Sequence, residues 1–243
     1  MPTTDVYLLG SGIRHTLQLT LETIQALEAS RVAFVLHDDL SVIDSLRRWC
    51  PDVRDVASAY EGKVLRRDAY AEIAELVVRE ARTEPTVSLV VHGHPLMLVS
   101  ASEMVLSAAR DAGLAARALP GVSFLDTLLC DLEYEHAYGL QLFEATTMLE
   151  RGWLPNPALA SFVTQIATVL NYEVTVHEPS PRTLDPLVAH LRKVYPADHP
   201  CQIVYSASDL LGVSTTTTVR LADLPFTEDL ALGRRPTLYM PAM

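Results

Sequence analysis

The sequence is poor in basic residues and has no basic stripe. Lysine and arginine number 19 against 30 aspartates and glutamates, which gives a formal net charge of -11. The densest basic patches are arginine pairs, at Arg47-Arg48, Arg66-Arg67 and Arg234-Arg235. Because proteins that bind nucleic acids concentrate positive charge on one face, we expect no nucleic-acid partner. The acidic balance also argues against attraction to an anionic membrane surface.

Long hydrophobic runs and targeting signals are lacking too. The apolar stretch from Val87 to Val99 is interrupted by His92 and His94 and is too short to cross a bilayer. The first residues contain no basic region followed by an apolar segment, so no signal peptide is expected. We therefore predict a cytoplasmic protein that does not enter the membrane.

Cysteines are few and widely spaced. Cys50, Cys130 and Cys201 form neither a disulfide framework nor a zinc-binding pattern, and reduced thiols are the simple expectation. Cys50 and Cys130 stand within apolar helical patterns and are predicted to be core residues.

Apolar residues recur along the whole chain and make up 49% of its 243 residues, enough for one large core or two modest ones. In the first half, apolar strands alternate with helical patterns. Strands are predicted over residues 6–9, 32–36, 87–91 and 116–119. Helices are predicted to about residue 30 and over 42–49, 70–82 and about 100–112, with Ser100 or Ser102 capping the last and residues 51–63 forming a loop. Such alternation is typical of a mostly parallel sheet.

The pattern changes after Pro120-Gly121. Ser123 is predicted to cap a helix through residue 131. Further helices are expected over 146–151 and 184–194, and strands over 141–144, 162–170, 202–205, 216–221 and 237–240. Several of these strands are rich in β-branched residues, which favours antiparallel pairing. We predict an α/β protein with two lobes, residues 1–119 with a mostly parallel sheet and residues 120–243 with a mixed sheet.

Three polar loops follow predicted strands of the first lobe, at residues 10–12, 37–39 and 92–95. Right-handed crossovers place such loops on one edge of a parallel sheet, and ligands of open α/β sheets bind at that edge. Each loop also has a structural interpretation. Gly10-Ser11-Gly12 forms either a phosphate cradle or a tight turn, and the third glycine of a dinucleotide fingerprint is replaced by His15.

The histidines and aspartates of these loops give no clear metal pattern. In His37-Asp38-Asp39 an aspartate at a helix start is more typical of a helix cap than of a metal ligand. His92 and His94 alternate as zinc ligands can, yet no third ligand is near, so shaping the loop is the better interpretation. We predict no metal site.

Tyr60, Arg66 and Tyr70 form the remaining polar set. Arg66 and Tyr70 are four residues apart at a helix start and therefore share a face. An arginine can stabilise a developing oxyanion, and a tyrosine can donate to the same oxygen or, if ionised, accept a proton. A surface cation packed on aromatic rings also explains the spacing, and spacing alone slightly favours that structural interpretation.

Five short motifs in order resemble the tetrapyrrole methylase superfamily of methyltransferases that use S-adenosylmethionine (SAM). They are Leu8-Leu-Gly-Ser-Gly-Ile13, Gly93-His-Pro95, Pro120-Gly-Val-Ser123, Glu144-Ala-Thr146 and Thr237-Leu-Tyr-Met-Pro241. The resemblance covers nearly the entire chain and implies a two-lobed fold with SAM in a cleft between the lobes. It also implies S-adenosylhomocysteine as a product.

The histidine in Gly93-His94-Pro95 is more similar to the borosin peptide α-N-methyltransferases, since most tetrapyrrole-modifying members carry Gly-Asp-Pro there. That branch also carries a Tyr, Arg, Tyr set at spacings of six and four, which Tyr60, Arg66 and Tyr70 match. The resemblance therefore implies that these three residues are catalytic. It further implies iterative methylation of backbone amides in a ribosomal precursor peptide, an interlocked homodimer and, since the chain stops just past the methylase lobe, a peptide supplied in trans.

By the same resemblance, ten residues fall on positions that contact the cofactor: Gly10, His92, His94, Met97, Ser123, Phe124, Gln165, Ser206, Pro236 and Thr237. Three of them depart from the usual residue, because His92 replaces a tyrosine, Phe124 a small residue and Pro236 a serine. A SAM site of this kind does not need the glycine fingerprint that His15 interrupts.

The expected chemistry centres on the amide nitrogen, which is delocalised and a weak nucleophile. Arg66 and a tyrosine hydroxyl would hold the carbonyl oxygen in an imidate-like form. Tyr60 or Tyr70 could instead help to remove the amide proton, which needs a lowered phenol pKa, and Arg66 acts in that direction. The alternatives are a methyltransferase for a tetrapyrrole or other small molecule, an enzyme that binds NAD through residues 10–12 and Asp38, and a non-catalytic binding protein on the same fold.

Overall fold

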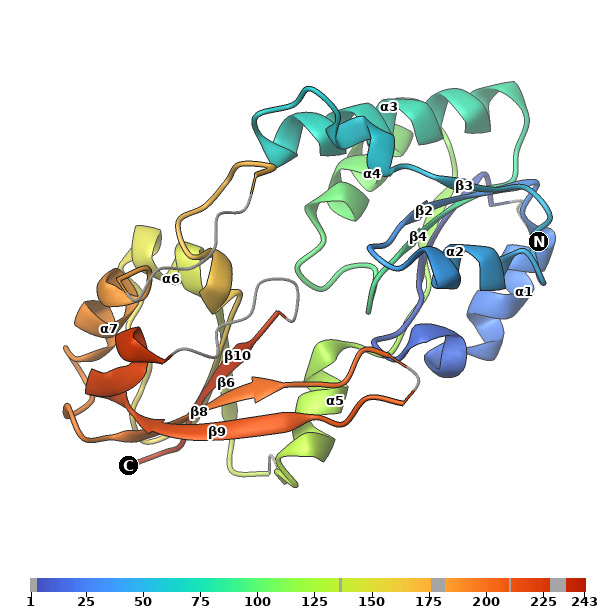
Figure 1. The fold of residues 1–243 in the computed structure, drawn as a ribbon. Coiled ribbons are helices and arrows are strands. Elements are labelled where there is room, and N and C mark those ends of the chain that lie inside the picture. Colours follow the sequence, from blue (N-terminus) through green and yellow to red (C-terminus); the bar gives the residue numbers. More distant parts are fainter. Residues whose placement is uncertain (1–3, 136, 176–181, 210, 228–234) are drawn as a thin grey trace. The chain divides into compact units, whose positions relative to one another are not determined.

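The computed structural model describes residues 4–135, 137–175, 182–209, 211–227 and 235–243. Its contacts divide the chain into two compact units, each with its own sheet (Figure 1). Unit 1 comprises residues 1–127 together with 172–174 and 208–211, and unit 2 comprises residues 128–171, 175–207 and 212–243. The predicted lobes, 1–119 and 120–243, remain a prediction of domain organisation.

Unit 1 is built around a sheet of five parallel strands in the order β3-β2-β4-β1-β5. The strands are β1 (Val6–Gly10), β2 (Val32–Leu36), β3 (Val53–Asp55), β4 (Val87–Val91) and β5 (Ala116–Ala118). Its helices are α1 (Leu21–Ala29), α2 (Leu40–Leu46), α3 (Arg66–Thr83) and α4 (Ser100–Asp111), with the 3-10 helices η1 (His15–Gln18) and η2 (Ala57–Tyr60). The predicted parallel sheet is confirmed.

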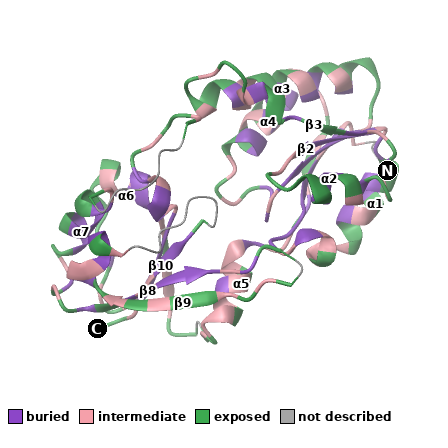
Figure 2. Cartoon of the chain, viewed as in Figure 1, coloured by how far each residue is buried: buried purple, intermediate pink, exposed green. Residues whose placement is uncertain are grey.

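Alternate residues of these strands face different helices. Leu8 and Phe34 belong to a buried cluster with residues of α3 and α4. Leu9 and Val35, one position along, belong to a second cluster with residues of α1 and α2. The central strands are therefore buried on both faces, as Figures 1 and 2 show. This explains why their sequences are continuous apolar runs.

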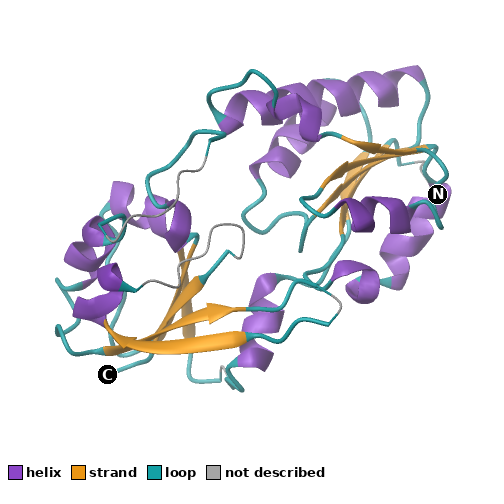
Figure 3. Ribbon diagram, in the orientation of Figure 1, coloured by secondary structure: helices purple, strands orange, loops and turns teal. Residues whose placement is uncertain are grey.

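Unit 2 has a mixed sheet in the order β6-β7-β10-β8-β9 (Figure 3). Its strands are β6 (Leu140–Glu144), β7 (Ala160–Thr164), β8 (Pro200–Tyr205), β9 (Thr215–Arg220) and β10 (Thr237–Met240). β6 and β7 are parallel and the other pairs are antiparallel. α6 (Ala145–Arg151), α7 (Asp185–Leu191), η3 (Ile166–Thr168) and η4 (Leu221–Phe226) complete the unit, and α5 (Phe124–Asp131) leads into it. The predicted mixed sheet is confirmed.

Three local predictions are wrong. Residues 51–63 are not all loop, because the short strand β3 pairs with β2 and η2 ends at Tyr60. The strand predicted over 162–170 ends at Thr164, since Gln165 adopts a left-handed backbone with φ of 57° and starts η3. Neither serine caps α4, whose N-cap is Val99.

The cysteines differ from the prediction in one case. Cys50 is fully buried, but Cys130 on α5 is exposed. α5 is half-buried along most of its length, so its apolar pattern does not bury every position. No helix among the described residues is long and apolar enough to cross a membrane.

Candidate active site

The loops after β1 and β4 are joined by backbone hydrogen bonds at the carboxyl edge of the unit 1 sheet. Ser11 N donates to Val91 O at 2.8 Å, and Gly93 N donates to Gly12 O at 2.9 Å. Gly12 N returns a bond to Gly93 O at 3.3 Å. The two loops therefore form a short antiparallel bridge beyond the parallel strands, and it fixes where His92 leaves the sheet.

Three glycines pack backbone to backbone at this bridge. A Cβ on Gly10 would overlap the carbonyl oxygen of Gly93 and lie 3.1 Å from Pro95 Cδ. A Cβ on Gly121 would lie 3.2 Å from the same oxygen and 3.3 Å from Gly10 Cα. Gly10 and Gly121 are thus needed for close backbone approach to Gly93, whereas the positive φ of the predicted tight turn is found at Gly12, at 78°.

His92 is half-buried and pairs with a second histidine from the neighbouring strand. Its Nδ1 lies 3.0 Å from Nε2 of His37, and the two rings meet edge to face at 5.0 Å. Asp39 caps α2 by accepting from Ser41 N at 2.8 Å, which confirms the predicted cap. His94 accepts Leu96 N at 3.1 Å through Nδ1, so it shapes its own loop. The part of the chain that the structure describes contains no group of three metal-ligating side chains.

Tyr60, Arg66 and Tyr70 lie together in unit 1, and the predicted shared helix start of Arg66 and Tyr70 is observed. Tyr60 ends η2, while Arg66 and Tyr70 lie in the first turns of α3, and all three are half-buried. The two tyrosine rings meet edge to face with centroids 6.1 Å apart, and their hydroxyls are hydrogen-bonded. Arg66 lies close enough to act electrostatically on Tyr60, as does Asp38 after β2.

Burial raises the pKa of Tyr60 above its ordinary value of about 10. Tyr70 raises this pKa further, both by electrostatic repulsion and through the hydrogen bond between the two hydroxyls. The negative charge of Asp38 raises it as well. Arg66 acts in the opposite direction, as expected, but does not prevail. The hydrogen bond with Tyr70 therefore favours the neutral form of Tyr60. A base role for Tyr60 needs its pKa lowered, whereas its surroundings raise that pKa; which tyrosine handles the amide proton stays a prediction.

The start of α3 depends on a segment from much later in the chain. Its N-cap, Leu65, makes no side-chain capping bond. Instead, Arg66 N donates to Tyr172 O at 3.1 Å, and Val174 N donates to Val64 O at 2.8 Å. This short antiparallel pairing satisfies an amide that the helix leaves without a partner and fixes the backbone that carries Arg66.

Ser123 occupies a reciprocal capping arrangement at the start of α5. Its N and Oγ both donate to Oδ2 of Asp126 at 2.6 Å, and Asp126 N points back to Ser123 Oγ at 3.4 Å. Ser123 is buried, whereas Phe124 and the loop residue Met97 are half-buried. The predicted cap is confirmed.

In unit 2, the expected cofactor residues gather at one edge of the sheet. Gln165 follows β7 and Ser206 follows β8, while the antiparallel β10 begins there, with Thr237 opposite Val204. Ser206 Oγ donates to Asp131 Oδ2 at 2.6 Å. Pro236 and Thr237 are both buried. The four residues thus share an edge of the unit 2 sheet.

Glu144, at the same edge, has a structural role. Its carboxylate caps α6 by accepting Thr146 N at 2.9 Å, Thr147 N at 2.7 Å and Thr147 Oγ at 2.6 Å. Thr146 Oγ in turn accepts Leu170 N at 2.9 Å. The Glu-Ala-Thr motif therefore starts a helix and ties it to the turn after β7.

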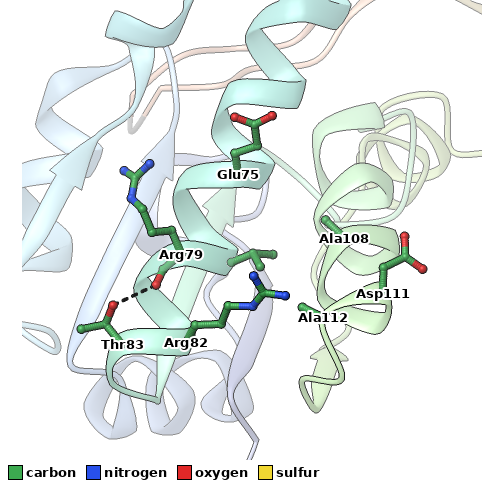
Figure 4. A pocket seen from close by; sticks show the side chains of 8 residues that line it. Glu75, Arg79, Arg82, Thr83, Ala108, Asp111 and Ala112 are labelled. Carbon is green, nitrogen blue, oxygen red and sulfur yellow. Dashed lines mark hydrogen bonds between the residues drawn. The ribbon is translucent and has the colours of Figure 1, made fainter.

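A groove of about 550 Å³ lies between α3 and α4, away from this set (Figure 4). Glu75, Arg79, Arg82 and Asp111 line it with exposed charged side chains. These residues belong to the later turns of each helix, whereas Arg66 and Tyr70 stand at the start of α3. The groove is therefore not part of the candidate active site.

Sequence reasoning missed the polar partners of the site residues. His37 was interpreted as part of a helix-cap segment, and the structure makes it the partner of His92. Asp126 and Asp131 hold Ser123 and Ser206. The spacing of Ser123 and Asp126 is a capping signal that could have been found, while the other two pairs depend on strand order and packing.

Comparison with known proteins points to one family. The family model for tetrapyrrole (corrin/porphyrin) methylases matches residues 5–221. A methyltransferase and ribosomally synthesised type III borosin cyclic peptide precursor of Anomoporia bombycina is 32% identical over 212 residues, 86% of this chain and 24% of that protein. A type II borosin counterpart of Phlebiopsis gigantea is 28% identical over 99% of this chain and 43% of its own length. The chain spans less than half the length of these two curated relatives.

Solved structures share the fold. Uroporphyrin-III-C-methyltransferase from Thermus thermophilus superposes with a TM-score of 0.67 at 21% identity, covering 97% of this chain and 91% of the other. The same enzyme complexed with S-adenosyl homocysteine gives 0.65 at 19% identity, covering 97% and 96% of the two chains. Cobalt precorrin-4 methyltransferase gives 0.66 at 16% identity, covering 97% and 94%.

Proposed function

The chain belongs to the tetrapyrrole (corrin/porphyrin) methylase family, and from that premise we propose that this SAM-dependent methyltransferase methylates backbone amide nitrogens of a peptide. The observation that carries the proposal is the cluster of Tyr60, Arg66 and Tyr70 at the start of α3. It supplies a permanent cation and a hydrogen-bonded pair of phenols within one unit. The borosin precursors among the relatives support a peptide substrate over a ring.

The cluster fits an amide substrate because the amide must be activated through its oxygen. Delocalisation removes electron density from the nitrogen and places it on the carbonyl. Donors that hold the oxygen more strongly as it gains charge favour an imidate-like nitrogen that can attack. Arg66 and the hydroxyl of Tyr70 are these donors. Removing one such donor commonly costs roughly 3–4 kcal/mol in the barrier.

Tyr60 orients the Tyr70 hydroxyl in this proposal. The two hydroxyls are hydrogen-bonded, and a donor that is held in place before the substrate binds does not have to be ordered on binding. With its pKa raised, Tyr60 stays protonated at neutral pH. The amide proton therefore leaves to a group other than Tyr60, with water the simplest acceptor.

SAM, when bound, supplies an electrophilic methyl group on a sulfonium. The residues expected to hold it suit its chemistry: hydroxyls of Ser123, Ser206 and Thr237, the imidazole of His92 and the apolar side chains of Met97 and Phe124. Hydroxyl and imidazole groups match a ribose and a carboxylate, and apolar side chains match an adenine. The bridge between the β1 and β4 loops fixes His92 beside the glycine contact, so the donors do not have to be ordered on binding.

The precursor peptide and the homodimer belong to the same proposal. In the relatives, methyltransferase and precursor are named as one protein. We expect this chain to accept its peptide in trans, and to do so as a dimer. Light scattering during the methylation assay measures the second expectation directly.

The test is a methylation reaction with SAM and each short peptide encoded beside the gene, analysed by tandem mass spectrometry. We expect successive single-methyl mass steps on backbone nitrogens, one S-adenosylhomocysteine per step, and at least a hundredfold loss in Arg66→Ala and Tyr70→Phe. Tyr138→Phe, a change at an exposed tyrosine of unit 2, is the matched control and keeps the wild-type rate. Methylation of a tetrapyrrole ring in place of any peptide would refute the proposal, as would full activity in both site variants.

A further inference from the structure

His37 and His92 form a hydrogen-bonded pair at the carboxyl edge of the unit 1 sheet. They follow β2 and β4, which are neighbours, and the last residues of these strands, Leu36 and Val91, are directly paired. The two side chains therefore leave adjacent strands at the same level, and Nε2 of His37 meets Nδ1 of His92 at 3.0 Å. Both residues lie in unit 1, so the pair does not depend on the second unit.

The backbone of the turn between β2 and α2 determines which ring nitrogen of His37 carries the proton. Asp39 N donates to Nδ1 of His37 at 2.9 Å, and an amide N–H can only donate. Nδ1 of His37 is therefore unprotonated, and the proton of the neutral ring is on Nε2. Asp39 itself is held as the cap of α2, through Ser41 N at 2.8 Å and Ser41 Oγ at 2.7 Å. The acceptor role of His37 is thus built into the start of a helix.

The same logic passes to His92. Because Nε2 of His37 carries the proton, it donates to Nδ1 of His92. His92 Nδ1 is then the acceptor, and the proton of a neutral His92 is on Nε2. One tautomer of His92 is selected by a chain of two hydrogen bonds that begins at a backbone amide.

We propose that His37 is a positioning residue that holds His92 as an Nε2–H donor toward an acceptor atom of bound SAM. The inference rests on the proposed function, in which His92 contacts the cofactor. A tyrosine, the usual residue at this position by resemblance, offers a hydroxyl donor without ambiguity. An imidazole offers either a donor or an acceptor, so replacing tyrosine by histidine requires a second residue to fix the tautomer, and His37 supplies it.

The discriminating variant is His37→Asn. An asparagine oxygen accepts an amide N–H two residues on, so the bond from Asp39 N is kept. The donor to His92 is lost, because the asparagine side chain is too short to reach it. SAM dissociation constants from calorimetry should rise about 3- to 10-fold, the equivalent of one net hydrogen bond, and most of the kinetic effect should fall on the KM for SAM rather than on kcat.

His92→Tyr gives the matched background. A tyrosine needs no tautomer lock, so His37→Asn should change SAM affinity less than twofold when position 92 is already tyrosine. An equal loss in both backgrounds would show that His37 acts through general folding, and it would overturn the inference. An unchanged affinity in the single variant would overturn it as well.

Nitrogen NMR of the ¹⁵N-histidine-labelled protein tests the lock without activity. Wild-type His92 should show one protonated nitrogen, Nε2, and His37→Asn should show a mixture of tautomers. Protonation of His92 at Nδ1 in the wild type would exclude the mechanism. Should the wild type bind no SAM by calorimetry, the proposed function fails, while the NMR result still decides whether the lock exists.

Discussion

Replacing Gly10 by alanine should damage unit 1 even though the backbone of Gly10 needs no unusual conformation. The added Cβ would overlap the carbonyl oxygen of Gly93, and Pro95 Cδ stands 3.1 Å away on the same side. These atoms belong to backbone and a proline ring, so no flexible side chain can move aside. The β1 and β4 strand ends must separate instead.

The magnitude follows from what that separation breaks. Overpacking by one methyl group costs about 1–3 kcal/mol. Each hydrogen bond lost from the bridge between the loops, such as Ser11 N to Val91 O, costs about 1 kcal/mol more. We expect Gly10→Ala to reduce the free energy of unfolding by roughly 2–4 kcal/mol. Displacing Gly93 should also move the adjacent His92 and weaken SAM binding.

Two other glycines grade the effect. Gly121→Ala places its Cβ 3.2 Å from Gly93 O, a tight but tolerable contact, so its cost should be smaller than that of Gly10→Ala. Gly113→Ala meets no atom within 4 Å but has a φ of +71°, so it reports backbone strain alone, at about 1 kcal/mol. Gly10→Ala should therefore destabilise the protein more than either Gly121→Ala or Gly113→Ala.

Urea unfolding measures this order within unit 1. Trp49 is packed against the α1/α2 face of the sheet, and Trp153 lies in unit 2. A Trp153→Phe background therefore leaves Trp49 as the only tryptophan reporter. If Gly10→Ala costs no more than Gly113→Ala, close backbone packing is not what fixes the glycine, and the account of the bridge is wrong.

Three further predictions follow from single side chains. Glu144→Ala removes the cap of α6 and should lower the free energy of unfolding by about 2 kcal/mol, which circular dichroism should show as a Tm lower by about 4–8 °C. Glu144→Gln keeps an acceptor oxygen and should lower Tm less. Equal decreases in Tm for the two variants would contradict the capping role. The pKa of Tyr60 is higher in the folded protein than in the unfolded chain, so the protonated Tyr60 hydroxyl contributes stability below a pH of about 10, and this stability is lost as the pH rises further. Ultraviolet difference titration of the wild type against Tyr60→Phe should therefore show no phenolate from Tyr60 below that pH. Iodoacetamide followed by peptide mass spectrometry should label exposed Cys130 first and spare Cys201, whose burial raises its pKa to about 12; rapid labelling of Cys201 would refute its burial.

Strand positions could be predicted because parallel strands buried on both faces have continuous apolar runs. β4 is the clearest example, with five buried residues. Strand order could not be predicted in this way. β4 lies between β2 and β1, and only that order brings His37 next to His92. The sequence therefore indicated which residues and motifs form the candidate site, but not which side chains contact one another there.

The wrong local predictions have physical causes as well. β3 has only three residues, of which Val53 alone is buried, so it carries almost no apolar signal. After β7 the apolar pattern continues through η3, and only the left-handed backbone of Gln165 ends the strand. The pKa of Tyr60 could not be predicted from the sequence either, because burial and the neighbouring Tyr70 hydroxyl raise it, and both arise from packing.

The pairing of residues 64–66 with residues 172–174 has a consequence for how the protein is made. The strands of the unit 1 sheet have all left the ribosome well before Tyr172 is translated, so the sheet can form first. The last of these strands, β5, ends at Ala118, so the backbone bond from Arg66 to Tyr172 must wait roughly fifty residues longer than the sheet. At about 5–20 residues per second, that delay is about 3–10 seconds. During synthesis the start of α3, which carries Arg66 and Tyr70, is therefore among the last parts of unit 1 to be completed, and a nascent chain halted before Tyr172 would carry the sheet with an unfinished candidate site.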